Sequence, residues 1–195
     1  MSQEPPSAGV HESRADEDDV ARIVVAWQRE RSDLDVEPLH ILSRISRLAK
    51  QQARLRNAAF AVHGLDGWEF DVLAALRRAG HPYELSPGQL VAETLVTSGT
   101  MTTRVDRLID RGLVERRPDP RDRRGVLVRL TPAGRDIVDA AMSSLLRLEH
   151  TLIATLSEQD RAGLPGALRR LLLAAGDAAH STDLPSSPDL DGPEH

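Results

Sequence analysis

The stretch TSGTMTTRVDRLIDRGLVERRPDPRDRRGVLVRLTP, residues 97–132, concentrates positive charge in a chain that is acidic as a whole. Between Arg104 and Arg129 it contains nine arginines and five acidic residues, whereas the complete chain has a formal net charge of −5. Affinity for phosphate depends on where the positive charge lies rather than on its total. We therefore expect this segment to have a different partner from the rest of the surface.

The first part of this stretch predicts a helix over about 98–111, with Thr97 or Ser98 as its N-cap and Gly112 after its end. The segment SPGQLVAETL just before it opens with a Ser-Pro start signal for another short helix. Two short helices joined by only a few residues predict a helix-turn-helix.

The second of these helices has two chemically different faces. At about 100° per residue, Val105 and Leu108 fall beside Met101 and predict a packed face, whereas Thr103 and Arg107 fall opposite. Arginine and threonine are side chains that helices in the major groove use. Including the basic loop that follows, the predicted DNA-binding residues are Ser98, Thr100, Thr102, Thr103, Arg107, Arg121, Arg123 and Arg124.

The runs LVERR and GVLVRLT flank the turn-rich PDPRDRR and predict a β-hairpin over about 114–131 with a basic tip. Such a tip fits an element that lies on phosphates or inserts arginine into a narrow minor groove. An alternative stays open, because these arginines could instead form surface ion pairs with the aspartates of the same segment.

The remaining chain shows helical periodicity on both sides of this region. We predict a disordered tail at 1–16, an added helix and first dimerisation helix at 17–62, a winged helix-turn-helix domain at 63–131, dimerisation helices at 132–178 and a disordered tail at 179–195. Ser157 and Asp160 predict a helix start, and Pro165 predicts a break or kink. The fold class is mainly α with a small β-hairpin wing, and the outer helices, apolar on one side, predict a homodimer.

Several classes of function are disfavoured. The chain has no cysteine, which excludes disulfides and thiolate chemistry. No catalytic motif is present, and the histidines at 40, 63, 81 and 150 lack the spacing of metal ligands, so we expect no enzyme, no cofactor and no metal. With no signal sequence and no membrane-length apolar run, we expect a cytoplasmic protein. A helical dimer without a DNA role would leave the basic hairpin unexplained.

The segment from Thr97 to Arg135 resembles the recognition helix, wing and following helix of the MarR family, and the wing motif is DPRDRR at 119–124. The resemblance covers about 34–176 and implies a homodimeric regulator that reads an imperfect palindrome. It also implies that Asp122 braces the wing tip while Arg124 enters the minor groove.

Two further segments, WQRERSDLDVEPLHILSRISRLA at 27–49 and FDVLAALRRAG at 70–80, resemble the PecS/HucR-type urate-responsive branch. This resemblance implies that urate is the effector and that Trp27, Asp71, Arg104 and Arg116 bind it. It suggests that the anion attracts both arginines, is repelled by Asp71 and moves the recognition helix through Arg104. A regulator of this family that responds to a different small aromatic or anionic ligand remains the alternative.

Periodicity alone gives plainer interpretations of these four residues. Arg104 falls to the side of the recognition helix, where it could point between lobes. Arg116 alternates with Val114 and could face a pocket or solvent. Asp71 lies on the polar side of its helix, and Trp27 continues an apolar stripe that predicts a core position.

Overall fold

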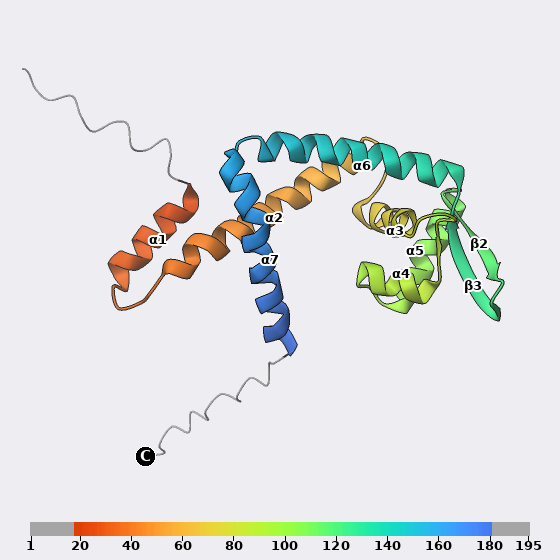
Figure 1. Ribbon diagram of the computed structural model, residues 1–195, viewed down its shortest axis with the longest axis horizontal. Coiled ribbons are helices and arrows are strands. Elements are labelled where there is room, and N and C mark those ends of the chain that lie inside the picture. The colour runs from red at the N-terminus through yellow and green to blue at the C-terminus, as the bar shows by residue number, and fades with distance from the viewer. Residues whose placement is uncertain (1–17, 181–195) are drawn as a thin grey trace, which may run out of the picture. The chain divides into compact units, whose positions relative to one another are not determined.

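The computed structural model describes residues 18–180, except for the side chains of Arg123, Arg124 and residues 177–180. In chain order the elements are α1 (Asp19–Glu30), α2 (Glu37–Ala61), α3 (Gly67–Arg78), β1 (Glu84–Leu85), α4 (Pro87–Thr94), α5 (Ser98–Asp110), β2 (Val114–Asp119), β3 (Asp122–Leu130), α6 (Pro132–Ile153) and α7 (Glu158–His180) (Figure 1). The mainly helical fold with a small wing is as predicted. The predicted tails at 1–16 and from 181 onward lie outside the described residues, whereas residues 179 and 180 belong to α7.

The chain divides into two compact units between Leu146 and Arg147, within α6. In the first unit one core joins the end of α2, α3, α4, α5, the sheet and α6, and its fully buried side chains include Leu73, Leu90, Leu108 and Val128. Because α5 contributes its apolar face to this core, its opposite face is left at the surface. None of the helices within 18–180 combines the length and apolar character that crossing a bilayer requires.

The wing is one edge of a three-stranded antiparallel sheet of order β1-β3-β2. The predicted hairpin is present, with Val114 paired to Leu130 and an irregularity between Pro118 and Asp119. The sequence did not predict β1, which pairs Glu84 with Arg129. Two residues are too few to show the alternation that identifies a strand.

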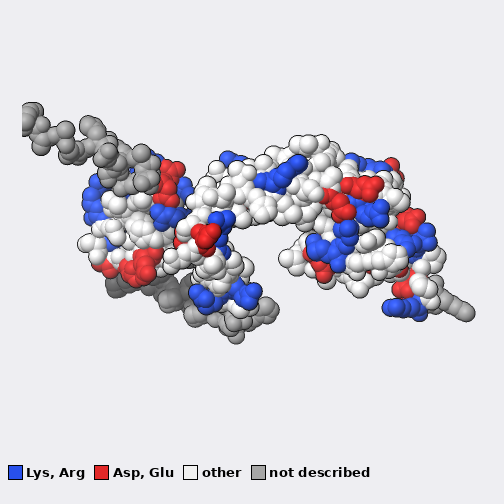
Figure 2. Space-filling model, turned by 45° about the horizontal axis from the view of Figure 1, so that its top comes forward, with Lys and Arg blue, Asp and Glu red and all other residues white. Residues whose placement is uncertain are grey.

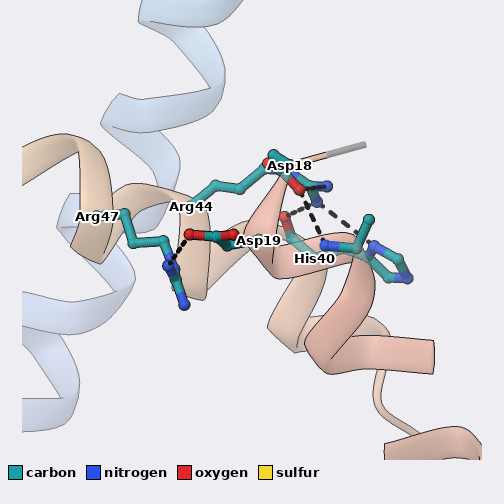
Figure 3. Close-up of polar contacts among 6 residues, drawn as sticks. Asp18, Asp19, His40, Arg44 and Arg47 are labelled. Atoms are coloured by element: carbon teal, nitrogen blue, oxygen red, sulfur yellow. Dashed lines mark hydrogen bonds and ion pairs between the residues drawn. The ribbon is translucent and has the colours of Figure 1, made fainter. Parts of the chain in front are cut away.

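The first helix is attached to the N-terminal half of α2 by charged groups (Figure 3). Asp18 caps α1 by accepting a hydrogen bond from the Ala21 backbone N–H, and its carboxylate also accepts bonds from Arg44 Nε at 2.8 Å and Nη2 at 2.9 Å. Asp19 lies 3.6 Å from Arg47. Hydrogen bonding from Arg44 is the largest cause that lowers the pKa of Asp18. The Asp18 carboxylate therefore stays ionised to a lower pH than an ordinary aspartate, and its contact with Arg44 weakens as pH falls through that lowered pKa.

The last helix begins as predicted but does not break where predicted. The Asp160 N–H donates to Ser157 Oγ at 3.1 Å, which caps α7. Pro165 lies inside α7, so the predicted break is absent, and a kink at this position stays a prediction. Proline removes one backbone donor and its ring crowds the carbonyl four residues earlier, but the helix continues because the other backbone hydrogen bonds propagate it.

The start of α6 lies directly against the chain that leads into β2. Thr131 Oγ1 lies 2.8 Å from the Gly112 carbonyl oxygen and accepts a hydrogen bond from the Gly134 N–H at 3.0 Å. A Cβ atom at Gly134 would lie only 1.9 Å from the carbonyl oxygen of Leu113. Only glycine permits this approach, because the atom that would be struck belongs to backbone and cannot rotate away.

Replacing Gly134 by alanine should therefore force the start of α6 away from Leu113. We expect the Gly134→Ala substitution to lower the free energy of unfolding by about 3 kcal/mol, as for an overpacked core. Urea denaturation followed by circular dichroism measures this change. Gly99→Ala is the matched control, since nothing lies within 4 Å of its Cβ position; it should change stability by less than about 1 kcal/mol. Equal effects of the two substitutions would contradict the argument.

Candidate nucleic-acid interface

The exposed face of α5 carries the hydroxyl groups that the sequence placed there. Thr97 is the N-cap, and its Oγ1 accepts a hydrogen bond from the Thr100 N–H at 3.3 Å. Thr102 and Thr103 donate their hydroxyl protons to backbone carbonyls one turn earlier, at 3.1 Å and 3.3 Å. Their oxygen lone pairs remain available to an external donor. All the predicted α5 residues are exposed: Ser98, Thr100, Thr102, Thr103 and Arg107.

The wing presents a basic edge beside this helix. Arg121 is exposed, and its backbone N–H donates to Asp119 Oδ1 at 2.8 Å, which tightens the turn. The side chains of Arg123 and Arg124 lie outside the described residues, so the predicted bracing of Arg124 by Asp122 stays a prediction. Figure 2 shows basic side chains interspersed with acidic ones over the winged-helix part of the chain.

The ion-pair interpretation is confirmed for two of the arginines, and DNA contact by the others stays a prediction. Arg116 pairs with Asp106 at 2.7 Å and Arg117 with Glu115 at 2.7 Å. Arg107 and Arg121 form no ion pair with any side chain in the described part of the chain. The guanidinium groups of Arg107 and Arg121 can therefore bind a phosphate or a base edge without first breaking such an ion pair.

An ion pair to a buried carboxylate orients the recognition helix. Glu69 is only 4% exposed and is the one buried charged side chain among the described residues. Its Oε2 accepts hydrogen bonds from Arg111 Nη1 at 2.6 Å and from the Asp66 N–H at 2.9 Å. Arg111 also donates to the Gly64 carbonyl at 2.9 Å. Arg111 follows the last residue of α5, so this network fixes the end of α5 to the beginning of α3.

Of the four predicted effector residues, one lies on α3 and another points toward it. Asp71 accepts a hydrogen bond from Arg56 Nη2 of α2 at 3.1 Å. The Arg104 guanidinium of α5 lies 5.5 Å from the Trp68 ring centroid. Trp68 and Asp71 are three residues apart and therefore share a helix face. Arg104 points back toward α3, as its sideways position on the helix suggested.

The other two effector residues are placed differently. Arg116 is held at Asp106, on α5, two residues from Arg104. Trp27 is 49% exposed, so its predicted core position is wrong. The helix α1 packs near Leu39, and about 25 Å of α2 separate Leu39 from Arg56 at a rise of 1.5 Å per residue. Within one chain Trp27 does not reach Asp71, because α1 packs on the N-terminal part of α2. The residues of α1 that are buried there are Val20 and Val24.

Arg56 is a residue that the sequence reasoning missed. Its guanidinium carbon lies 5.3 Å from the Phe60 ring centroid and 5.8 Å from that of Phe70, and these two rings stack with centroids 4.0 Å apart. The spacing of Arg56 and Phe60 could have suggested the first contact, since residues four apart meet on a helix. The pairing with Asp71 depends on how α2 packs on α3, which no local pattern reveals.

The packed pair α4 and α5, with the β2–β3 hairpin beside it, defines the chain as a winged helix-turn-helix protein. The sequence model of the MarR family matches residues 63–125. The chain is 35% identical over 153 residues to the HTH-type transcriptional regulator PecS of Dickeya dadantii, a match that covers 78% of this chain and 92% of PecS.

Two solved structures share this fold. A mutant MarR from Escherichia coli complexed with operator DNA is 30% identical, with a TM-score of 0.59, over 71% of this chain and 99% of that one. BpsR from Bordetella bronchiseptica, studied for regulation of its DNA binding by 6-hydroxynicotinic acid, is 27% identical, with a TM-score of 0.56, over 67% and 91%. The chain belongs to the MarR family and is a DNA-binding transcriptional regulator, not an enzyme.

Removing Arg111 should leave the buried carboxylate of Glu69 without its cation. We expect the Arg111→Ala substitution to lower the free energy of unfolding by about 1–3 kcal/mol, because it removes a hydrogen-bond partner of a buried carboxylate while Arg111 itself is partly exposed. Arg78→Ala is the control, because Arg78 and Glu93 form an exposed pair worth less than about 1 kcal/mol. Urea unfolding measures both, and a mild effect of Arg111→Ala would show that Glu69 does not need its partner.

Arg107 and Arg121 should contribute to DNA binding in distinguishable ways. We expect Arg121→Ala to weaken binding to all sequences alike and to reduce the slope of log K against log salt by about one. Arg107→Ala should cost about 1–3 kcal/mol on the operator and less on unrelated DNA. Fluorescence anisotropy at several salt concentrations separates the two effects. Identical losses on operator and unrelated DNA for Arg107→Ala would show that Arg107 contacts only the backbone.

Proposed function

We propose that this regulator is a repressor that binds a palindromic operator as a homodimer and is released by urate or a related purine. The observation that carries the operator binding is the exposed face of α5, which presents hydroxyl groups and Arg107 next to a basic wing. A two-fold dimer would place two such helices in successive major grooves about 34 Å apart, which matches a palindromic site.

Exposed apolar side chains support the homodimer. Ile41, Leu42 and Leu48 of α2 are each about half exposed, and Leu172 and Leu173 of α7 are more exposed still. Side chains of this size gain free energy when they are removed from water, at about 25 cal/mol per Å². A second copy of the chain would bury the same helix faces symmetrically.

The effector would bind where α3 meets α2 and α5. Urate is a planar monoanion near neutral pH, so the guanidinium groups of Arg56 and Arg104 would attract it. In the free protein Arg56 neutralises Asp71, and an anion must compete with this carboxylate for Arg56. Because Arg104 belongs to α5, an anion that draws it from Trp68 would shift the recognition helix.

A small energetic preference suffices for release. An effector that binds the DNA-incompetent form better by about 1–3 kcal/mol changes operator affinity by about 5- to 150-fold. Trp27 would reach this site only from the second copy of the dimer or after α1 leaves α2, since α1 packs at the other end of α2. The similarity to PecS and the conjunction of Asp71 with two arginines support this effector site.

A different aromatic anion is the second candidate effector. BpsR responds to 6-hydroxynicotinic acid, a planar ring with a carboxylate, and it shares the fold of this chain. The same two guanidinium groups would attract such a carboxylate. Urate and 6-hydroxynicotinate must therefore be compared directly.

The testing experiment is fluorescence anisotropy of labelled DNA from upstream of the protein's own gene, at fixed salt. Protein is added first, and urate or 6-hydroxynicotinate is titrated afterwards. Tight binding that urate alone reverses would support the proposal, and reversal by 6-hydroxynicotinate alone would favour the second candidate. Binding that neither compound changes would discard both effectors while leaving the regulator intact.

Arg104→Ala should separate DNA binding from the response to the effector. We expect the variant to keep operator affinity within a few fold, because Arg104 contacts Trp68 rather than the exposed face, and to require at least tenfold more urate for release. Arg78→Ala, which removes an exposed arginine between α3 and α4, should behave like the wild type. The assignment of Arg104 would be wrong if both variants released DNA at the same urate concentration.

A further inference from the structure

Leu95 ends α4 in an unusual way. Its backbone has φ 54° and ψ 41°, in the left-handed region, and its side chain is 93% exposed, the highest value among the large apolar residues that the structure describes. The next residue, Val96, is half-buried and packs against the core. Leu95 is therefore held in a strained conformation without gaining any burial.

Three other helices, α2, α3 and α5, are followed by a glycine that adopts the left-handed region. Gly64, Gly80 and Gly112 follow α2, α3 and α5 with φ of 65°, 77° and 68°. Glycine adopts this region freely, whereas a residue with a Cβ atom is disfavoured there. A leucine at the equivalent point after α4 is thus unfavourable both for the backbone and for solvation, and neither packing nor local conformation accounts for it.

The place of Leu95 in the fold supplies an explanation. It lies two residues before Thr97, the N-cap of α5, and three before the exposed Ser98. The N-terminal end of a recognition helix is the part that enters the major groove. The major groove contains one apolar group on its base edges, the C5-methyl of thymine. An exposed leucine beside the polar helix start is complementary to that group.

We propose that Leu95 contacts a thymine methyl group next to the bases that α5 reads, and so adds a preference for an A·T pair at that position. This inference rests on the operator binding proposed above. The contact would remove from water an apolar side chain that the free protein leaves exposed, and this burial would favour the DNA complex.

The variant that tests the proposal is Leu95→Asn, because asparagine tolerates the left-handed region while removing the apolar contact. We expect its melting temperature to equal or exceed that of the wild type. Its operator affinity should fall at least about fourfold, the equivalent of one buried methyl-sized group. The salt dependence of binding should not change, because no phosphate contact is lost.

Uracil-containing DNA identifies the group that is contacted. Operator duplex synthesised with uracil in place of thymine lacks the methyl groups but keeps the same hydrogen-bonding edges. The wild type should lose affinity on this duplex, and Leu95→Asn should lose at least about threefold less, because deletion of both partners is not additive. Val62→Ala serves as the control: Val62 is 79% exposed after α2, and its loss should not alter sensitivity to uracil.

Each outcome is decisive. Absence of salt-dependent DNA binding by the wild type would overturn the operator proposal and the role of Leu95 together. Normal operator affinity of Leu95→Asn would overturn the role of Leu95 alone. A weakened Leu95→Asn variant that loses as much affinity on uracil DNA as the wild type would show that thymine methyl groups are not its target. Greater stability together with weaker, uracil-insensitive binding supports the proposal.

Discussion

The ion pair between Glu69 and Arg111 is the constraint on which the DNA-binding lobe depends. A carboxylate that is almost fully removed from water needs a cation and hydrogen-bond donors, and Arg111 with the Asp66 backbone supplies them. The ion pair joins the end of the recognition helix to the start of α3. The direction in which α5 presents its exposed threonines and Arg107 is therefore set relative to α3, while the shared core sets its depth.

The helix α3 is held on its other sides by weaker contacts. Arg56 of α2 bonds Asp71, and Asp139 of α6 bonds Arg77 at 2.9 Å and 3.2 Å. The hydrogen bonds that Arg77 donates to Asp139 are the largest cause that raises the pKa of Arg77. Ion pairs as exposed as these contribute little net stability, so an anion can replace one at small cost. The stacked rings of Phe60 and Phe70 still hold α2 on α3, so the replaceable part of this contact is the ion pair between Arg56 and Asp71.

The sequence was sufficient wherever the signal was local. Thr97 and Ser157 cap their helices as predicted, the hairpin follows its two β-favouring runs, and the helix wheel correctly separated the buried and exposed faces of α5. The failures involve tertiary choices. Apolar periodicity predicted that Trp27 is buried. In the structure the buried residues of α1 are Val20 and Val24, which pack with Val36 and Leu39. The charge pattern suggested partners for the arginines but could not distinguish a buried pair from an exposed one.

The candidate effector site was predictable only in part. The resemblance to the urate-responsive branch predicted Asp71 and Arg104; Asp71 lies on α3, and Arg104 of α5 points toward Trp68 of the same helix. Arg56 carries no motif, and its role arises from the crossing of two helices. No periodic pattern predicts the positions of Trp27 and Arg116. The position of Trp27 depends on where α1 packs, and that of Arg116 depends on its ion pair with Asp106 of α5.

The close approach of Gly134 to Leu113 has a mechanical meaning for the whole lobe. Where a side chain separates two elements, it can change rotamer and so absorb small displacements. Here the first turn of α6 contacts the backbone directly, one residue before β2, so no side chain lies between them to absorb a displacement. A tilt at this end of α6 is therefore transmitted directly to the wing, and the wing and the first turn of α6 move together.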